Sequence, residues 1–154
     1  MTLPHVVVVR IDRHIESVGK IFYGDYSNSP QWISKVQKEL SLASISFLPD
    51  KVMGIYYDNP QEKSADQLKS FQGVFISDAT ARIPDSLYRV SLSGDYLYVR
   101  VSGDPIQSLF EGYRMLFEHV RAASTDLEST AGYQISTFDS GMVTTEIYMK
   151  LRVR

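Results

Sequence analysis

The sequence of 154 residues contains no cysteine. This absence excludes disulfide bonds, thiol nucleophiles and thiolate metal ligands, and it fits a chain that does not depend on an oxidising compartment. The three histidines, His5, His14 and His119, have no spacing that builds a metal site. Phosphate-binding glycine loops and the common hydrolase motifs are also missing. We therefore expect no metal and no cofactor.

An excess of charge of one sign is missing as well. Sixteen basic and eighteen acidic residues give a formal net charge of −2, and the basic residues are dispersed. A surface that follows a phosphate backbone needs a cationic stripe, which this sequence does not provide. We expect no direct binding to nucleic acid.

Long apolar runs are absent from the start of the chain. The four valines of residues 6–9 are followed at once by Arg10 and Asp12. This run is too short for a membrane span or for the apolar region of a signal peptide, and it predicts a first strand instead. We expect a cytoplasmic protein with no membrane partner.

Tyrosine, in contrast, is abundant. Aromatic residues form 12% of the chain, and ten of them are tyrosines, whose rings combine an apolar body with a polar tip that suits binding surfaces. In the stretch GIYYDNP, Tyr56 and Tyr57 are the last residues of a predicted strand, and the Asp-Asn-Pro that follows predicts a turn. Neighbouring side chains in a strand point to opposite faces, so we expect one ring to line a groove and the other to pack or face solvent. The alternation does not say which.

The first half of the sequence predicts a strand, a helix and two further strands. The expected strands cover residues 6–12, 52–57 and 69–77. A helix is expected within 27–43, where serine and asparagine supply capping signals and a proline lies in the first turn. Its apolar side consists of Trp32, Ile33, Val36 and Leu40.

The second half repeats this order. Residues 86–104 hold two alternating runs, and residues 132–153 predict two strands joined by an Asp-Ser-Gly turn. Between them, residues 104–123 predict a helix that begins with a cap and a proline. This helix has a wide apolar stripe made of Ile106, Leu109, Phe110, Tyr113, Leu116, Phe117 and Val120.

The two halves indicate an internal duplication. Gly24-Asp25 and Gly103-Asp104 each lie at a strand-to-helix junction, 79 residues apart (24 to 103). We expect one domain over 1–154, built from pseudo-repeats 1–77 and 87–154. The predicted class is α+β, in which duplicated strand-helix-strand-strand units form one mostly antiparallel sheet. Both helices would pack on one face of this sheet, with a groove between the halves.

Three segments, residues 53–77, 101–120 and 144–153, resemble the GyrI-like small-molecule-binding domain, which is the effector-binding domain of bacterial multidrug-sensing transcription regulators. A Tyr-Tyr-Asp-x-Pro pattern matches residues 56–60, and a Thr-Glu-Ile-Tyr pattern matches residues 145–148. The resemblance implies a groove walled by aromatic rings, with an acidic residue for cationic lipophilic compounds. Two departures concern ligand type: Lys69 replaces a frequent arginine, and a glutamate usual in the penultimate strand is missing around 135–138.

Glu146 has two interpretations. Alternation places Ile147, Met149 and Leu151 on one face of the last strand, and Glu146, Tyr148 and Lys150 on the other. If the helices cover the first face, Glu146 is either a solvated charge near Lys150 or the carboxylate of an aromatic pocket. Trp32, Tyr113 and Phe117 likewise are either core residues or pocket walls. The complete set of candidate ligand-binding residues is Glu146, Tyr148, Tyr56, Tyr57, Trp32, Phe71, Tyr98, Tyr113 and Phe117.

Two functions follow from these residues. The first is binding of a small organic molecule, which can be cationic, lipophilic or aromatic, in the sensing or sequestration of toxic compounds. The second is a hydrolase that uses Glu146 as general base, with a tyrosine orienting the substrate. No catalytic residue is evident besides Glu146, which favours binding. Once the two repeats are assigned, no residues remain for a DNA-binding helix-turn-helix. We therefore expect that control of transcription would require a separate partner regulator. A homodimer is an alternative partner.

Overall fold

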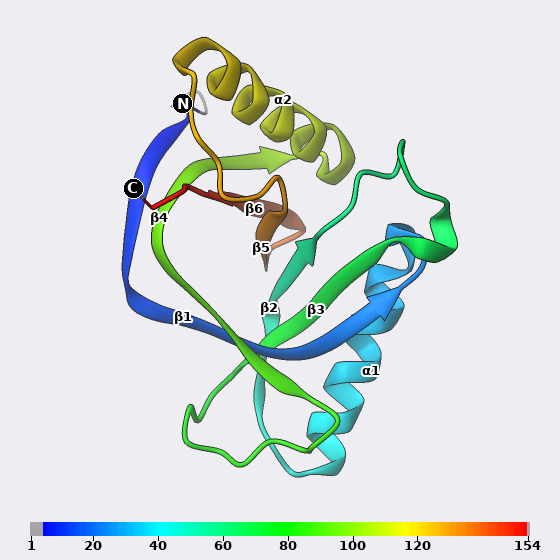
Figure 1. Ribbon diagram of the computed structural model, residues 1–154. Helices are drawn as coiled ribbons and strands as arrows, with labels where there is room; N and C mark the ends of the chain where they lie inside the picture. Colours follow the sequence, from blue (N-terminus) through cyan, green and yellow to red (C-terminus); the bar gives the residue numbers. More distant parts are fainter. Residues whose placement is uncertain (1–4, 154) are drawn as a thin grey trace.

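The computed structural model describes residues 5–153, except for the side chains of Arg13 and His14. The expectation that His14 takes part in no metal site therefore concerns a side chain outside the described residues. Figure 1 shows a ring of strands with two helices outside it. The elements are β1 (Val7–Tyr23), α1 (Ser29–Leu42), β2 (Phe47–Tyr56), β3 (Lys69–Ile76), β4 (Tyr88–Gly103), α2 (Pro105–Ala123), β5 (Gly132–Asp139) and β6 (Met142–Lys150). Two short 3-10 helices are η1 (Tyr26–Asn28) and η2 (Ala65–Gln67).

The strands form a closed barrel in the order β1-β3-β2-β5-β6-β4, in which β4 pairs with β1 and every pairing is antiparallel. This confirms the α+β class, with two helices and a mostly antiparallel sheet. The halves meet twice, through β1 and β4 and through β2 and β5. These two junctions close the sheet on itself, which the local sequence pattern does not specify. Each half has the predicted order of strand, helix and two strands. That the halves superpose stays a prediction.

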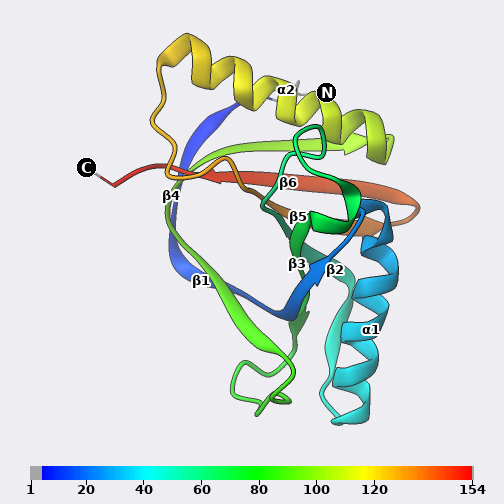
Figure 2. The same ribbon diagram turned by 45° about the vertical axis from the view of Figure 1, so that its right-hand side comes forward.

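The long strands β1 and β4 differ most from the sequence expectations. β1 continues far beyond residue 12, and the two alternating runs of residues 86–104 form one strand of 16 residues. These strands pair along most of their length, and that tertiary pairing keeps the chain extended where local signals are weak. The ladder shifts its register between Ile11 and Ile15, and Gly94 in β4 has a φ of 101°. These irregularities accompany the bend of the two strands around the barrel (Figure 2).

α1 packs on the strands of the first half, β1, β2 and β3. The side chains of Trp32, Val36 and Leu40 are buried, as the apolar spacing predicts. Val36 and Leu40 join a cluster with Val18 of β1 and Val74 of β3. The 3.6-residue period of this helix therefore identified the face that contacts the sheet.

α2 packs on β4 and β6 of the second half. Leu116 is fully buried in a cluster with Ile147 and Met149, while Gly112 allows a close approach because a Cβ there would lie 2.8 Å from Ile147 Cδ1. The wide apolar stripe is only partly covered, since Ile106 and Phe110 are 82% and 73% exposed. The stripe is broader than the side of α2 that contacts the sheet. Neither described helix combines the length and apolar character that crossing a membrane requires.

The two Gly-Asp junctions have the same local chemistry. Gly24 and Gly103 both have positive φ, 142° and 117°, a conformation that glycine adopts readily. The Asp25 carboxylate accepts a hydrogen bond from the Ser27 amide, and the Asp104 carboxylate accepts from the amides of Ile106 and Gln107. The carboxylates thus satisfy amides that the first helical turn leaves unpaired.

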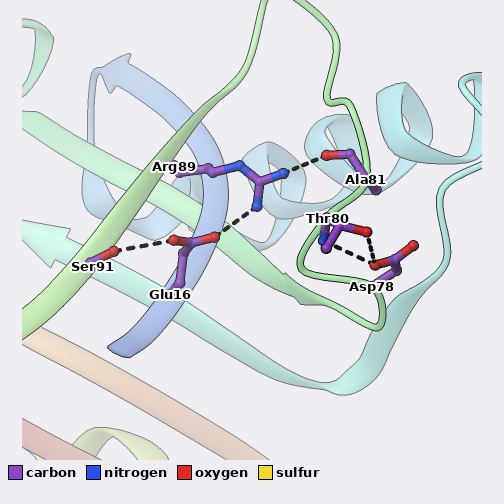
Figure 3. Close-up of polar contacts among 6 residues, drawn as sticks. All are labelled: Glu16, Asp78, Thr80, Ala81, Arg89 and Ser91. Carbon is purple, nitrogen blue, oxygen red and sulfur yellow. Dashed lines mark hydrogen bonds and ion pairs between the residues drawn. The ribbon is translucent and has the colours of Figure 1, made fainter. Parts of the chain in front are cut away.

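The segment between β3 and β4 is tied to the barrel by Arg89 (Figure 3). Its guanidinium donates one hydrogen bond to Glu16 Oε1 over 2.7 Å and another to the Ala81 carbonyl. Within the segment, the Asp78 carboxylate accepts hydrogen bonds from the Thr80 amide and hydroxyl. Arg89 therefore connects a long loop to the neighbouring strands β1 and β4.

Candidate functional site

A cavity of about 560 Å³ lies at the junction of the two halves. Its volume is within the roughly 300–1,000 Å³ typical of small-molecule sites. The first half contributes η1, the end of β2 and the loop that follows, and the second half contributes α2 and β5. The lining residues are Tyr26, Tyr56, Tyr57, Asp58, Asn59, Pro60, Glu62, Leu109, Tyr113, Phe117, Thr130, Gly132 and Gln134.

Two glycines make room for aromatic rings against the sheet. Gly132 of β5 pairs with Tyr56 of β2, and Gly54 of β2 pairs with Gln134 of β5. A Cβ on Gly132 would lie 2.8 Å from two ring carbons of Tyr113, and a Cβ on Gly54 would lie 2.7 Å from the Tyr56 ring. Both distances are too short for real contacts. A larger residue at either strand position would therefore displace the ring that lies against it.

Tyr113 and Gln134 form the polar contact within the cavity. The Gln134 side-chain amide donates a hydrogen bond to the Tyr113 hydroxyl over 2.6 Å. Burial raises the pKa of Tyr113, with a smaller opposing effect of the Gln134 hydrogen bond. Tyr113 is therefore a neutral phenol at physiological pH. Phe117, one turn further along α2, has its ring centroid 6.3 Å from that of Tyr113.

Tyr26 connects the loop that follows β2, which lines the cavity, to strand β3 of the barrel. Its hydroxyl donates to the Lys69 carbonyl over 2.8 Å and accepts from the Asp58 amide over 3.1 Å. Its ring meets the Tyr56 ring edge-on, with centroids 4.8 Å apart. The Asp58 carboxylate accepts from the Lys69 amide and forms an ion pair of 2.9 Å with Lys63, which holds the pKa of Asp58 below its usual value. The acidic side of this loop is thus compensated.

Both tyrosines of the GIYYDNP stretch line the cavity. The expectation that only one ring would do so is not met, because β2 ends at Tyr56 and the strict two-residue alternation ends with it. The ammonium of Lys69 lies 4.8 Å from the centroid of the Tyr57 ring. Burial, followed by the nearby Tyr133 and Tyr88, raises the pKa of Tyr57 to about 12.

Glu146 lies on the other face of the sheet, away from α2. Its neighbours in sequence, Ile147 and Met149, are fully buried in the cluster with Leu116, as the alternation predicts. Glu146 Oε2 accepts hydrogen bonds from the hydroxyls of Tyr98, at 2.9 Å, and Tyr148, at 3.2 Å. The carboxylate is therefore held by two phenols and is not simply solvated.

The same carboxylate affects the two phenols in return. Burial, followed by the hydrogen bond to Glu146 and its charge, raises the pKa of Tyr98. For Tyr148, burial comes first and the negative charge of Glu146 second in raising the pKa. Tyr148 also packs edge-on against Tyr96 in the interior cluster of the barrel. These side chains form a separate group, which we call the Glu146 cluster: Glu146, Tyr98 and Tyr148.

The nine sequence candidates thus fall into separate places. Tyr56, Tyr57, Tyr113 and Phe117 line the cavity; Glu146, Tyr98 and Tyr148 form the Glu146 cluster. Phe71 is fully buried inside the barrel, and Trp32 is buried between α1 and β1, where it stacks on Phe22 at 5.1 Å. Neither of the last two is among the described cavity residues.

Sequence reasoning missed several cavity residues, of which Tyr26 and Gln134 matter most chemically. Tyr26 follows the Gly24-Asp25 junction directly, and this position was a usable signal. Gln134 had none, because an isolated glutamine in a strand is usually a surface residue. Among the residues that the structure describes, no cluster of His, Asp and Glu could hold a metal ion.

No protein-family model matches the chain, and no curated protein matches it in sequence. Solved structures do share its fold. The C-terminal domain of EcmrR has a TM-score of 0.69 at 16% identity, over 99% of this chain and 100% of that one. In a complex of EcmrR with DNA, the match covers 59% of the longer EcmrR chain.

Two further structures are similar at lower scores. SAV2435 bound to tetraphenylphosphonium has a TM-score of 0.60 at 13% identity, over 96% of this chain and 94% of that one. A hydrolase encoded by lin2189 from Listeria innocua has a TM-score of 0.55 at 8% identity, over 97% and 91%. At these identities the likeness shows a shared fold, and this fold is consistent with the GyrI-like resemblance of the sequence.

Proposed function

We propose that this chain binds a small organic molecule with aromatic or lipophilic character in the cavity between its halves. The observation that carries the proposal is the cavity of about 560 Å³, whose walls bring together rings from η1, β2 and α2. Aromatic walls with few polar groups are typical of small-molecule sites. SAV2435, which shares the fold, is described with an organic ligand bound.

The biological role that fits this binding is the sensing or sequestration of toxic compounds. For a sensing role, the proposal includes a partner regulator protein or a second copy of the chain. In a sequestering role, the affinity for the ligand would depend on how much of its surface is buried against the rings of Tyr56, Tyr57 and Tyr113. Burying apolar ligand surface stabilises the complex by about 25 cal/mol per Å² before the entropic costs of binding.

A thermal-shift screen with cationic dyes, steroids and haem tests the proposal first, because a ligand that binds only the native state raises its unfolding midpoint. Hits are then measured by titration against Thr130→Trp, which adds an indole to an exposed wall position. We expect at least about a tenfold loss of affinity, since the indole competes for the cavity. The matched control is Arg121→Trp on the exposed side of α2. Equal affinities for both variants would contradict binding in this cavity.

Recognition of a cationic ligand by Glu146 is a separate part of the proposal. The supporting observation is that Glu146 is surrounded by the phenols of Tyr98 and Tyr148. A carboxylate beside aromatic rings attracts an organic cation through charge and through the ring faces. Because Glu146 is not among the described cavity residues, this recognition would occur at the barrel interior.

A hydrolase is the alternative function, and the hydrogen bonding of Glu146 supports it. Both phenols donate to Glu146 Oε2, so among the described contacts Oε1 remains available to accept a proton from a bound water. In this reaction Glu146 would be the general base and Tyr98 would orient the substrate. Hydrolysis of ester or epoxide substrates that is abolished by Glu146→Gln but retained in Tyr56→Phe would favour this alternative over binding alone.

A further inference from the structure

We propose that the cavity selects an uncharged, flat aromatic molecule whose edge carries adjacent hydrogen-bond donor and acceptor groups, as in an aromatic lactam. This inference rests on the proposed function, because it names the class of ligand for the same cavity. It departs from the cationic ligand that the sequence resemblance implies. Four observations carry it. Two are the positions of Lys69 and Lys63. The others are the hydrogen bonds that already occupy the Tyr26 hydroxyl and the unused hydrogen-bonding groups of the Tyr113–Gln134 pair.

The first lysine lies beside an aromatic ring of the cavity wall. Lys69 Nζ lies 4.8 Å from the centroid of the Tyr57 ring, within the distance of a cation–π contact. An organic cation at that wall would have to displace the ammonium or approach a like charge. Either event weakens binding of a cation, while an uncharged ring system meets no such repulsion.

The second lysine neutralises the acidic wall. Lys63 Nζ lies 2.9 Å from Asp58 Oδ1, and Asp58 Oδ2 accepts from the Lys69 amide over 2.7 Å. The remaining acidic residue among the described cavity walls, Glu62, is exposed on the loop. A solvated charge exerts a weak field because water screens it. Among the described residues, the interior of the cavity therefore contains no uncompensated carboxylate that would favour a cation.

The polar group that lines the cavity at Tyr113 and Gln134 is a neutral pair with unused hydrogen-bonding groups. Gln134 Nε2 donates to the Tyr113 hydroxyl over 2.6 Å. Among the described contacts, the Tyr113 O–H has no acceptor and Gln134 Oε1 has no donor, so a donor and an acceptor remain side by side. A lactam places a carbonyl and an N–H next to each other, so it can satisfy both groups. Desolvating a polar pair is favourable only when the ligand replaces its hydrogen bonds.

Tyr26 does not compete for this role. Its hydroxyl already bonds the Lys69 carbonyl and the Asp58 amide. It therefore serves as an aromatic wall, together with the Tyr56 ring that it contacts edge-on. The polar recognition of the ligand thus falls to Tyr113 and Gln134, and the remaining contacts are made by ring surfaces.

The test compares two three-ring probes of equal size, phenanthridin-6(5H)-one, which is a neutral lactam, and N-methylphenanthridinium, which is a cation. Fluorescence titrations of the full chain should show the lactam binding at least about tenfold more tightly than the cation, a difference typical of one well-placed hydrogen bond or unfavourable charge. Gln134→Glu places a carboxylate in the interior and should strengthen cation binding about tenfold while weakening the lactam. Gln107→Glu adds the same charge at the exposed start of α2 and is the matched control.

Gln134→Leu provides a second variant without added charge. It removes the acceptor and should weaken the lactam about tenfold with little effect on the cation. The proposal is overturned if the cation binds wild-type protein as tightly as the lactam and Thr130→Trp abolishes both. In that case the proposed function stands and only the ligand class is wrong. Absence of binding by both probes would overturn the ligand class, and a screen without cavity-dependent hits would overturn the proposed function itself.

Discussion

Gly132 of β5 lies directly against the ring of Tyr113 from α2, so that a Cβ at position 132 would be 2.8 Å from ring carbons Cε1 and Cζ. Gly132→Ala must therefore displace the ring and with it the hydrogen bond from Gln134. We expect a loss of about 1–3 kcal/mol in the free energy of unfolding, the usual scale for overpacking. Urea denaturation measures this loss.

The matched control for Gly132→Ala is the same substitution in a Tyr113→Ala background. Without the ring, the added methyl group has space, so the second substitution should cost much less there than in the wild-type background. Such a coupling is measured by a double-mutant cycle. An equal cost in both backgrounds would show that Gly132 is needed for the strand itself and not for the ring.

The pKa of Tyr57, raised to about 12 from 10.0, predicts a loss of stability in alkaline solution. The folded state holds the phenol proton more tightly than the unfolded state, so this contribution is complete below pH 10 and declines as pH rises toward 12. Tyr57→Phe should reduce the fall of the unfolding free energy between pH 9 and pH 11. Tyr23→Phe, at an exposed ring, is the control. An unchanged pH slope in Tyr57→Phe would contradict the prediction.

The carboxylate of Asp104 caps α2 through two backbone amides, at 3.1 Å and 2.9 Å. Asp104→Ala should destabilise the protein by about 1 kcal/mol, as is typical of a lost N-cap. Asp104→Asn keeps an acceptor oxygen and should restore most of this stability. Thermal unfolding of the three proteins makes the comparison. If asparagine is as destabilising as alanine, the cap hydrogen bonds do not account for the effect.

The bridge from Arg89 to Glu16 and the Ala81 carbonyl predicts that Arg89 orders the loop between β3 and β4. Arg89→Lys keeps the charge but cannot span both partners, so hydrogen exchange of residues 78–86 should accelerate. The overall stability should change by at most about 1 kcal/mol, because the pair is partly exposed. Arg10→Lys, at the exposed 4.0 Å pair with Asp95, is the control. Unaltered exchange in Arg89→Lys would rule out this anchoring role.

Glu146→Gln tests the proposed cation recognition at the barrel interior. It keeps an acceptor for the hydroxyls of Tyr98 and Tyr148 while it removes the charge. Binding of N-methylphenanthridinium should weaken by about 1–3 kcal/mol, and binding of the neutral lactam should stay nearly the same. Calorimetric titration of both ligands against both proteins gives the answer. Equal losses for the two ligands would show that the carboxylate does not select charge.

The sequence determined the local elements well where a physical signal was confined to a few residues. The helical period of Trp32, Val36 and Leu40 identified the buried face of α1, and the alternation from Glu146 to Leu151 identified the two faces of β6. The turn at Ser140 and Gly141, both with positive φ, also followed from the residues alone. Each of these features depends on the preferences of neighbours in the chain.

Only the tertiary structure decided which side chains meet. Whether the sheet closes depends on β1 pairing with β4 and β2 with β5, contacts between residues distant in sequence. Tyr113 and Gln134 are brought together by α2 crossing β5, and no pattern around glutamine indicates such a partner. Glu146, the most suggestive carboxylate in the sequence, lies on the opposite face from the rings of the cavity. Alternation separates the two faces of a strand, but three-dimensional packing determines what each face encloses.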